Sequence, residues 1–275
     1  MRVSLFEQFG ALNSGPVFSA LRQGLAVAGL KQSTDDMTAD VAVIWSMLWA
    51  GRMRGNRAVW QAYRKSGRPV IVVEVGMIRR GYTWKLGING TSIDSYPNSI
   101  VDVNRAEHLG IKLQPWQQGN NIVIAVQRAD SEQWAGQPPM TQWLHNTVNT
   151  IRKHTSRPIV VRSHPRFNIS MPDIVVEHPK KITGSYDDYD FDQTLKNAWA
   201  VVNWNSGPGP QSVIAGVPAF VGPSSLAAPV ANLNWSMIET PRMPDRTQWA
   251  NQLAHTEWTT QELATGAPIK RLLGI

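Results

Sequence analysis

The feature that most constrains this chain of 275 residues is an alternation of short apolar runs with helical segments. Runs such as Asp40–Trp45 and Pro69–Val75 are almost continuously apolar, which is typical of strands buried on both faces of a parallel sheet. Segments with helical spacing separate these runs, for example Asn56–Ser66, which ends at Gly67. The pattern predicts an α/β protein whose parallel sheets are covered by helices.

The alternation occurs twice, and residues 76–118, which are rich in Gly, Asn and Ser and show little periodicity, separate the two runs. Expected strands are Arg2–Phe6, Asp40–Trp45, Pro69–Val75, Asn121–Gln127, Arg157–Arg162, Asp173–Glu177, Ala200–Trp204 and Pro218–Val221. Expected helices are 17–28, 56–66, 141–154, 191–199, 211–216, 245–255 and 259–273, the last opened by Thr259 or Thr260 with Glu262. We therefore predict two Rossmann-like domains, 1–118 and 119–275, facing across a cleft, with C-terminal helices that pack back.

The formal net charge of +7 is concentrated in the first half of the chain. Residues 1–118 contain 14 Lys/Arg and 8 Asp/Glu (14 − 8 = +6), whereas residues 119–275 contain 13 and 12 (13 − 12 = +1). The bases between positions 52 and 85 are Arg52, Arg54, Arg57, Arg64, Lys65, Arg68, Arg79, Arg80 and Lys85, and they are interleaved with Trp49, Trp60, Tyr63, Tyr82 and Trp84. A basic surface with aromatic platforms suits a polynucleotide. The alternative is an ordinary solvated face whose aromatic side chains are buried.

Composition excludes several classes of protein. The chain has no cysteine, so disulfide scaffolds, zinc ribbons, iron–sulfur centres and thiol nucleophiles are excluded. No apolar run approaches the ~20 residues that a membrane helix needs. The first residues lack the pattern of a signal peptide, so we expect a cytoplasmic protein, in the host cytoplasm if a phage encodes it.

Polar residues follow several strands of the second half. Asn205-Ser206-Gly207 lies between an apolar strand and a helix, an arrangement that suits an anion, although its spacing is neither that of a P-loop nor that of a dinucleotide site. At the carboxyl ends of parallel strands such groups project toward a ligand. A purely structural turn is the alternative. The expected donor-binding residues are Gln127, Arg128, Arg162, His164, Asn205, Ser206, Gly207, Gln211 and Ser212.

Glu74 is the only acid between positions 41 and 93, and it ends a predicted strand. A carboxylate at that place among arginines is a candidate general base, with a structural ion pair as the alternative. The expected acceptor-binding residues are Arg52, Arg54, Arg57, Arg79, Arg80, Trp84, Lys85, Asn13 and Ser14. The acidic run Asp187–Asp192 directly precedes a helix and is interpreted as a cap, so no metal site is predicted.

These residues resemble a known family. The stretches Arg157–Pro165, Leu195–Ser206 and Ile214–Phe220 resemble the donor domain of GT-B glycosyltransferases, in which two Rossmann-like domains bind a nucleotide sugar. The segments Glu74–Arg79 and Trp84–Gly90 are similar to phage-encoded members, as are Trp249, His255–Trp258, Glu262 and Gly266. The resemblance implies contacts from Arg162, His164, Ser206 and Gly207 to the donor diphosphate. The family's usual ribose-binding glutamate is absent, and Gln211 and Ser212 stand there instead.

The leading hypothesis is a metal-independent glycosyltransferase that needs no cofactor. It transfers a sugar from a nucleotide-diphosphate sugar, with a UDP-sugar expected, to the hydroxyl of a modified pyrimidine such as 5-hydroxymethyl in double-stranded phage DNA, and no membrane partner is expected. The first domain would bind DNA and a flipped base, and Glu74 would deprotonate the acceptor. Three alternatives remain: transfer to a surface polysaccharide, a hydrolase or epimerase of sugar nucleotides, and a basic nucleic-acid-binding protein without activity.

Overall fold

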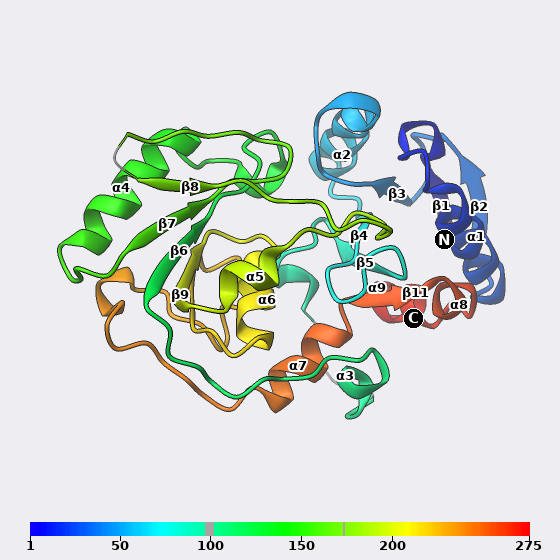
Figure 1. Cartoon of the computed structure of the whole chain (residues 1–275). Coiled ribbons are helices and arrows are strands. Elements are labelled where there is room, and N and C mark those ends of the chain that lie inside the picture. Colours follow the sequence, from blue (N-terminus) through cyan, green and yellow to red (C-terminus); the bar gives the residue numbers. More distant parts are fainter. Residues whose placement is uncertain (97–101, 173) are drawn as a thin grey trace. The chain divides into compact units, whose positions relative to one another are not determined.

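The computed structural model describes residues 1–96, 102–172 and 174–275, and these form two compact α/β units (Figure 1). The first unit contains Met1–Asn98, Asp130–Glu132 and His255–Ile275. The second contains Ser99–Ala129 and Gln133–Ala254. Within the described residues, no helix combines the length and the apolar character that crossing a membrane requires.

The first unit is built on a six-stranded sheet with the order β11-β5-β4-β3-β1-β2. Its strands are β1 (Arg2–Leu5), β2 (Lys31–Thr34), β3 (Val41–Trp45), β4 (Val70–Val75), β5 (Thr83–Ile88) and β11 (Glu257–Thr259). Strands β1 to β4 are parallel, whereas β5 is antiparallel to both β4 and β11. The parallel part matches the prediction from continuous apolar runs, since β3 is buried along its whole length.

Helices cover both faces of this sheet. The helical elements of the first unit are η1 (Glu7–Phe9), α1 (Gly15–Val27), η2 (Gly51–Gly55), α2 (Asn56–Lys65), η3 (Ile93–Ser95), α8 (Thr260–Ala264) and α9 (Ala267–Leu273). Leu21 of α1, Leu263 of α8 and Ile269 of α9 share one apolar core with the sheet. Val59 and Tyr63 of α2 pack with the other face of the sheet. Successive side chains along each strand point to opposite faces of the sheet and therefore contact different helices.

The second unit is built on a five-stranded sheet with the order β10-β9-β6-β7-β8, and all its pairs are parallel. Its strands are β6 (Asn121–Ala125), β7 (Ile159–Arg162), β8 (Val175–Glu177), β9 (Ala198–Asn203) and β10 (Ala219–Val221). The helical elements are α3 (Arg105–His108), η4 (Glu132–Trp134, split between the units), α4 (Met140–Arg152), α5 (Phe191–Leu195), α6 (Pro208–Ile214), η5 (Trp235–Met237) and α7 (Thr247–Ala254). Helix α4 covers one face of the sheet and α5 packs on the other (Figure 1). The order is that of a Rossmann-like sheet.

The prediction of an α/β chain with two parallel sheets is confirmed, and three strands were missed. Strand β2 reads Lys-Gln-Ser-Thr, so this edge strand carries no apolar signal. Strand β5 lies inside the segment predicted to be irregular, and β11 lies where the sequence predicts the junction of two helices. Of the predicted strand Asp173–Glu177, residue 173 lies outside the described residues.

The division into units differs from the predicted boundary near residue 118. Strand β11 pairs with β5, and this pairing brings residues 255–275 into the first unit. Thr259 caps α8 with a capping box completed by Glu262, as the sequence predicts. The single helix predicted over 259–273 is interrupted at Gly266, whose φ of +75° separates α8 from α9.

Helices α1 and α8 approach closely at Gly24, which is buried in α1. A Cβ atom at this position would lie 2.0 Å from the carbonyl oxygen of Leu263. We therefore expect Gly24→Ala to lower the free energy of unfolding by about 1–3 kcal/mol, because the helices must move apart. Urea denaturation measures this change.

The matched control is Gly15→Ala in the same helix, where an added Cβ meets no atom within 4 Å. This substitution is expected to change the free energy of unfolding by less than about 0.5 kcal/mol or to increase it slightly. Equal losses in the two variants would show that close helix packing is not the reason for Gly24.

Candidate functional site

The second sheet changes winding direction between β6 and β9. Strand β6 is the first strand of this unit in the chain, β7 and β8 follow on one side of it, and β9 and β10 lie on the other. Ligands of doubly wound sheets bind outside the carboxyl ends of the strands at such a switch point. The residues that follow β6 and β9 there, together with the last residue of β9, are Gln127, Asn203, Asn205 and Ser206, called here the β6–β9 junction.

Gln127 and Asn205 join the two strand ends by reciprocal hydrogen bonds. The Gln127 side-chain amide donates to Asn205 Oδ1 at 2.8 Å, and the Asn205 backbone amide donates to Gln127 Oε1 at 3.1 Å. Asn205 Nδ2 also donates to the Gln133 carbonyl at 2.9 Å and to Ser224 Oγ at 3.0 Å. These bonds occupy the polar atoms of both amides, so the pair positions the junction more than it reaches for a ligand.

Asn203, the last residue of β9, fixes the orientation of Ser206. It is fully buried, accepts a hydrogen bond from the Ser206 backbone amide at 2.9 Å, and donates to Ser206 Oγ at 3.0 Å. The hydroxyl oxygen accepts here, so its own hydrogen is available to a ligand oxygen. Asn203 was not among the residues expected from the sequence, although a polar residue at the end of an otherwise apolar strand is a signal that could have revealed it.

Helix α6 is a poorer anion site than the sequence suggested. Pro208 and Pro210 are among its first three residues and have no backbone N–H, and the Gly209 amide donates to the Ser206 carbonyl at 3.2 Å. Ser212 is fully buried and its hydroxyl donates to the Gly209 carbonyl at 2.8 Å. We therefore no longer expect Ser212 to contact a donor.

Gly207 and Gln211, two further residues expected to contact the donor, lie at the start of α6 and within it, next to the β6–β9 junction. Gly207 is the N-cap residue of α6, and Gln211 lies half-buried in the helix. Arg128 follows Gln127 and is half-buried as well.

Arg162 is engaged by two carboxylates. Its side chain is 7% exposed, bonds to Asp190 and lies 3.6 Å from Glu177 Oε2. Burial opposes ionisation of Asp190, but hydrogen bonds from the Lys180 amide and from Arg162 lower the pKa of this carboxyl overall. A buried guanidinium needs such partners, so Arg162 holds β7, β8 and residue 190 together and is not an open clamp for a diphosphate.

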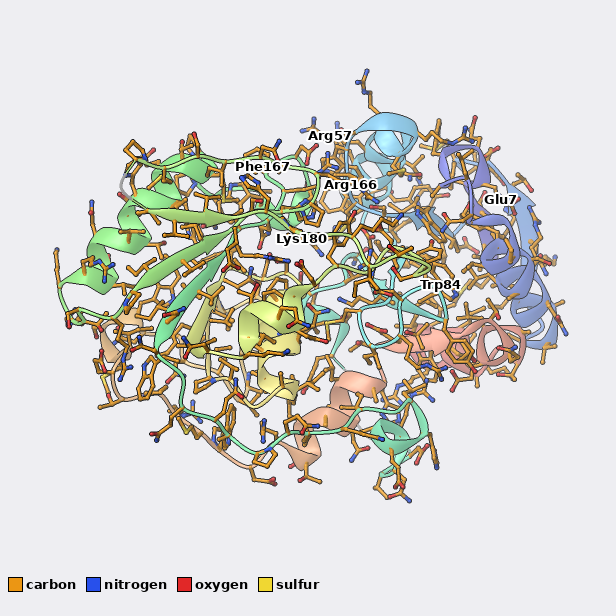
Figure 2. The ribbon with its side chains drawn as sticks, in the orientation of Figure 1. Glu7, Arg57, Trp84, Arg166, Phe167 and Lys180 are labelled. Atoms are coloured by element: carbon orange, nitrogen blue, oxygen red, sulfur yellow. The ribbon has the colours of Figure 1, made fainter. Side chains whose placement is uncertain are left out.

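His164 follows β7 and is half-buried. Its Nδ1 accepts a hydrogen bond from the Arg166 amide at 3.0 Å, so a neutral ring carries its hydrogen on Nε2. Figure 2 labels Arg166 and Phe167 in the segment after β7, and Phe167 forms an isolated bridge with His164.

In the first unit the winding direction changes between β1 and β3, and Glu74 lies close to the end of the next strand, β4. Ser46, directly after β3, has a φ of +70°, which is strained for a residue other than glycine. Its hydroxyl donates to Glu74 Oε1 at 2.6 Å, and the Met47 amide donates to the same oxygen at 3.2 Å. Burial raises the pKa of Glu74, although these hydrogen bonds and the charges of Lys85 and Arg80 oppose the shift.

Glu74, Lys85 and Glu257 form a row of alternating charges across β4, β5 and β11. Lys85 is the register partner of Glu74 on one side and of Glu257 on the other. Burial lowers the pKa of Lys85, and the two carboxylates oppose that shift. Lys85 is therefore a half-buried partner of Glu74, and this corrects its predicted role as a surface contact to DNA.

Glu257 shapes the turn between β4 and β5. It is fully buried and accepts hydrogen bonds from the Met77 amide at 2.7 Å, the Ile78 amide at 3.1 Å and the Thr83 hydroxyl at 2.7 Å. The turn that it organises carries Arg79 and Arg80. Nothing in the local sequence marks this role, because the contacts join residues about 180 positions apart.

The arginines and lysines of the basic segment between positions 52 and 85 fall into two groups, apart from Lys85. Helix α2 follows β3, so its beginning lies at the carboxyl edge of the sheet and its end lies at the opposite edge. The group at the carboxyl edge, called here the basic edge, consists of Arg52, Arg54 and Arg57 around the start of α2 and Arg79 and Arg80 in the β4–β5 turn. Figure 2 labels Arg57 on α2.

The other group consists of Arg64, Lys65 and Arg68, and the contacts of Arg68 stabilise the fold of the first unit. The Arg68 guanidinium stacks over the Tyr63 ring at 4.0 Å and donates to the carbonyls of Met37 and Ala39 at 2.8 Å. Arg64 and Lys65 lie at the same end of α2. These bases are not expected to contact the same stretch of a ligand as the basic edge.

Two further predicted acceptor contacts are corrected by burial. Trp84 is 5% exposed and packs against Trp45 with ring centroids 5.4 Å apart, so it offers no platform to a base. Ser14 is 5% exposed at the start of α1, whereas its neighbour Asn13 is exposed. Among the other aromatics, Tyr82 is 45% exposed, with the Arg79 guanidinium over its ring at 3.9 Å.

The described residues contain no group of three or more His, Asp or Glu side chains placed to hold a metal ion. The sequence matches no protein-family profile and no curated protein.

Solved structures show what the fold is similar to. The KpsC β-Kdo 2,4-transferase of Thermosulfurimonas dismutans superposes with a TM-score of 0.52 at 11% identity, covering 92% of this chain and 89% of that one. The β-Kdo 2,7-transferase of KpsC from the same organism gives 0.50 at 11% identity, with 98% and 99% covered. These likenesses show that the protein has a GT-B-like fold with two Rossmann-like units, as the sequence predicts.

The raised pKa of Glu74 predicts a pH-dependent stability. The folded protein holds this proton more tightly than the unfolded chain does, so the resulting stabilisation is full below the ordinary pKa of 4.5 and is lost as the pH rises through the raised value. We therefore expect Glu74→Gln to gain stability relative to the wild type as the pH rises from below 4.5 to neutrality. Urea denaturation at several pH values measures the difference. Glu107→Gln, which changes an exposed carboxylate, is the control and should show no such trend.

Proposed function

We propose that the protein is a glycosyltransferase that moves a sugar from a nucleotide-diphosphate sugar, expected to be a UDP-sugar, to the hydroxyl of a modified pyrimidine in double-stranded DNA. The observation that carries the proposal is the β6–β9 junction, where polar side chains are fixed at the switch point of a Rossmann-like sheet. A GT-B-like fold shared with two Kdo transferases supports the class of reaction.

The donor is assigned to the second unit. Ser206 has a hydroxyl hydrogen that can bind a diphosphate oxygen, Gly207 allows close approach of the backbone, and His164 is proposed as a further contact after the end of β7. Gln127 and Asn205 keep the junction in shape, and Arg162 fixes the end of β7 that carries His164. These groups, without a metal ion in the proposal, would stabilise the charge of the leaving diphosphate.

The acceptor is assigned to the first unit. The basic edge places five arginines at the carboxyl edge of the sheet, and Arg52, Arg54, Arg57 and Arg79 are exposed there. Arginines in such a group bind successive phosphates of a nucleic acid backbone. The hydroxyl of a base inside a duplex is out of reach of a catalytic group, so the target base must leave the stack.

Glu74 is the proposed general base. Its carboxylate takes the proton of the acceptor hydroxyl, the hydroxyl oxygen forms a bond to the anomeric carbon, and the bond from that carbon to the diphosphate breaks. The nucleoside diphosphate leaves with the electron pair. A raised pKa suits this role, because a base is most effective when its pKa lies near the working pH.

A second acceptor is supported by a specific observation. The two solved structures of similar fold are Kdo transferases, and the exposed arginines of the basic edge would suit an anionic polysaccharide as the acceptor. The assay below separates the two acceptors.

The direct test incubates the protein and a panel of nucleotide sugars with DNA that contains 5-hydroxymethylpyrimidines and, separately, with an anionic polysaccharide, and mass spectrometry then measures the mass of the nucleosides and of the polysaccharide. The expected result is a nucleoside heavier by one glycosyl residue. Glu74→Gln should lower the rate by about 10²–10⁴-fold while donor binding is retained, and the exposed Glu107→Gln should transfer like the wild type. If no donor gives a heavier nucleoside but an anionic polysaccharide is modified, the DNA acceptor is wrong.

A further inference from the structure

The loop between β1 and α1 presents an apolar side chain to solvent. Leu12 is 88% exposed, the highest value among the large apolar residues of the described chain. A single exposed leucine is common on protein surfaces and needs no explanation by itself. Its setting is what matters here, because the loop follows β1 at the switch point of the first sheet and accepts a hydrogen bond from Arg52 of the basic edge.

The loop that carries Leu12 is braced on both sides. The Gly10 amide donates to the Glu7 carbonyl at 2.8 Å, and the Ser14 amide donates to the Ala11 carbonyl at 3.0 Å. A Cβ at Gly10 would lie 2.3 Å from Ser14 Oγ and 3.0 Å from the Glu7 carbonyl oxygen, so the chain is closely packed at this turn. Figure 2 labels Glu7, where the loop begins. Leu12 is therefore displayed by a defined turn rather than by a frayed end.

The basic edge is attached to this loop. Arg52 Nε donates to the Gly10 carbonyl at 3.2 Å, which ties the residues before α2 to the turn that presents Leu12. Exposed Arg54 and Arg57 follow directly along the chain. An apolar side chain beside phosphate-binding arginines is the combination that proteins use to part stacked bases.

The distance between the end of β1 and the end of β4, where the proposed general base Glu74 lies, also suits duplex DNA. Strands β1 and β4 are separated by β3 alone, so their carboxyl ends lie about 10 Å apart. A base that leaves the stack swings outward from its neighbours by a comparable distance. Leu12, in the loop that follows β1, can thus enter the duplex while the extruded nucleobase approaches Glu74 at β4.

We propose that Leu12 is a wedge that enters the base stack of duplex DNA at the position vacated by the target pyrimidine. The inference rests on the proposed DNA acceptor and assigns the residue that holds the duplex open. An apolar side chain in the gap replaces part of the stacking lost on extrusion, while Arg52 and its neighbours hold the backbone. The partner is a double-stranded nucleic acid, since a single strand has no base pair to open and no opposite strand to hold apart.

The test compares kcat/KM of Leu12→Ala on one modified sequence supplied as duplex and as single strand. The wedge predicts a loss of about tenfold or more on the duplex and wild-type values on the single strand. Leu12→Met should restore most of the duplex activity. Val27→Ala, which truncates another exposed apolar residue (59% exposed), is the matched control and should act like the wild type on both.

Unchanged duplex activity in Leu12→Ala, or equal losses on duplex and single strand, would overturn the wedge alone. Absence of transfer by the wild-type protein on both forms would overturn the proposed DNA acceptor and the wedge with it. Melting temperatures of the variants, expected to be unchanged, show whether a loss of activity reflects unfolding.

Discussion

The candidate donor site depends on one interaction, the reciprocal hydrogen bonds between Gln127 and Asn205. After β6 and after β9 the chain turns in opposite directions. The backbone hydrogen bonds that join these two strands therefore do not continue past the strand ends. A pair of primary amides suits this place because each can donate and accept, and both remain uncharged when partly buried. Asn203, the last residue of β9, orients Ser206 by two further hydrogen bonds. The geometry of the junction therefore exists before any ligand binds, which lowers the entropy lost on binding.

The two units place charge in different ways. In the second unit the buried Arg162 contacts Asp190 and Glu177. These two contacts give the arginine a structural role. The first unit leaves most arginines of the basic edge exposed, and its Glu74 carboxylate has Ser46 and Lys85 as partners. The sheet position of Glu257 extends this arrangement, since the same carboxylate faces Lys85 and holds the turn that carries Arg79. The C-terminal segment thereby completes the site of the first unit.

Much of the fold could be predicted from the sequence because parallel strands buried on both faces carry a strong local signal. Strands β3, β4, β6 and β9 are continuous apolar runs, and each was found within a few residues. Strands β2 and β11 are held by their neighbours in the sheet rather than by their own composition, so no local pattern reveals them.

The candidate site was predictable in position and less so in detail. Strand ends identified Gln127, Asn205, Ser206 and Glu74, since topology alone brings such residues to one edge of each sheet. The roles of Arg162, Ser212 and Trp84 depended on tertiary partners, and burial changed all three. Asn203 and Glu257 were missed because their contacts are made inside the folded units.

The central claim is that the β6–β9 junction binds the diphosphate of a nucleotide sugar. Isothermal titration calorimetry with a panel of nucleoside diphosphates tests it without requiring the acceptor. If the junction binds the diphosphate, the wild-type protein will bind at least one of them, and Ser206→Ala will weaken binding by about tenfold or more, since a hydrogen bond to a charged group is lost. The exposed Ser170→Ala should bind like the wild type. No binding by the wild type, or equal affinity of Ser206→Ala, would contradict the account.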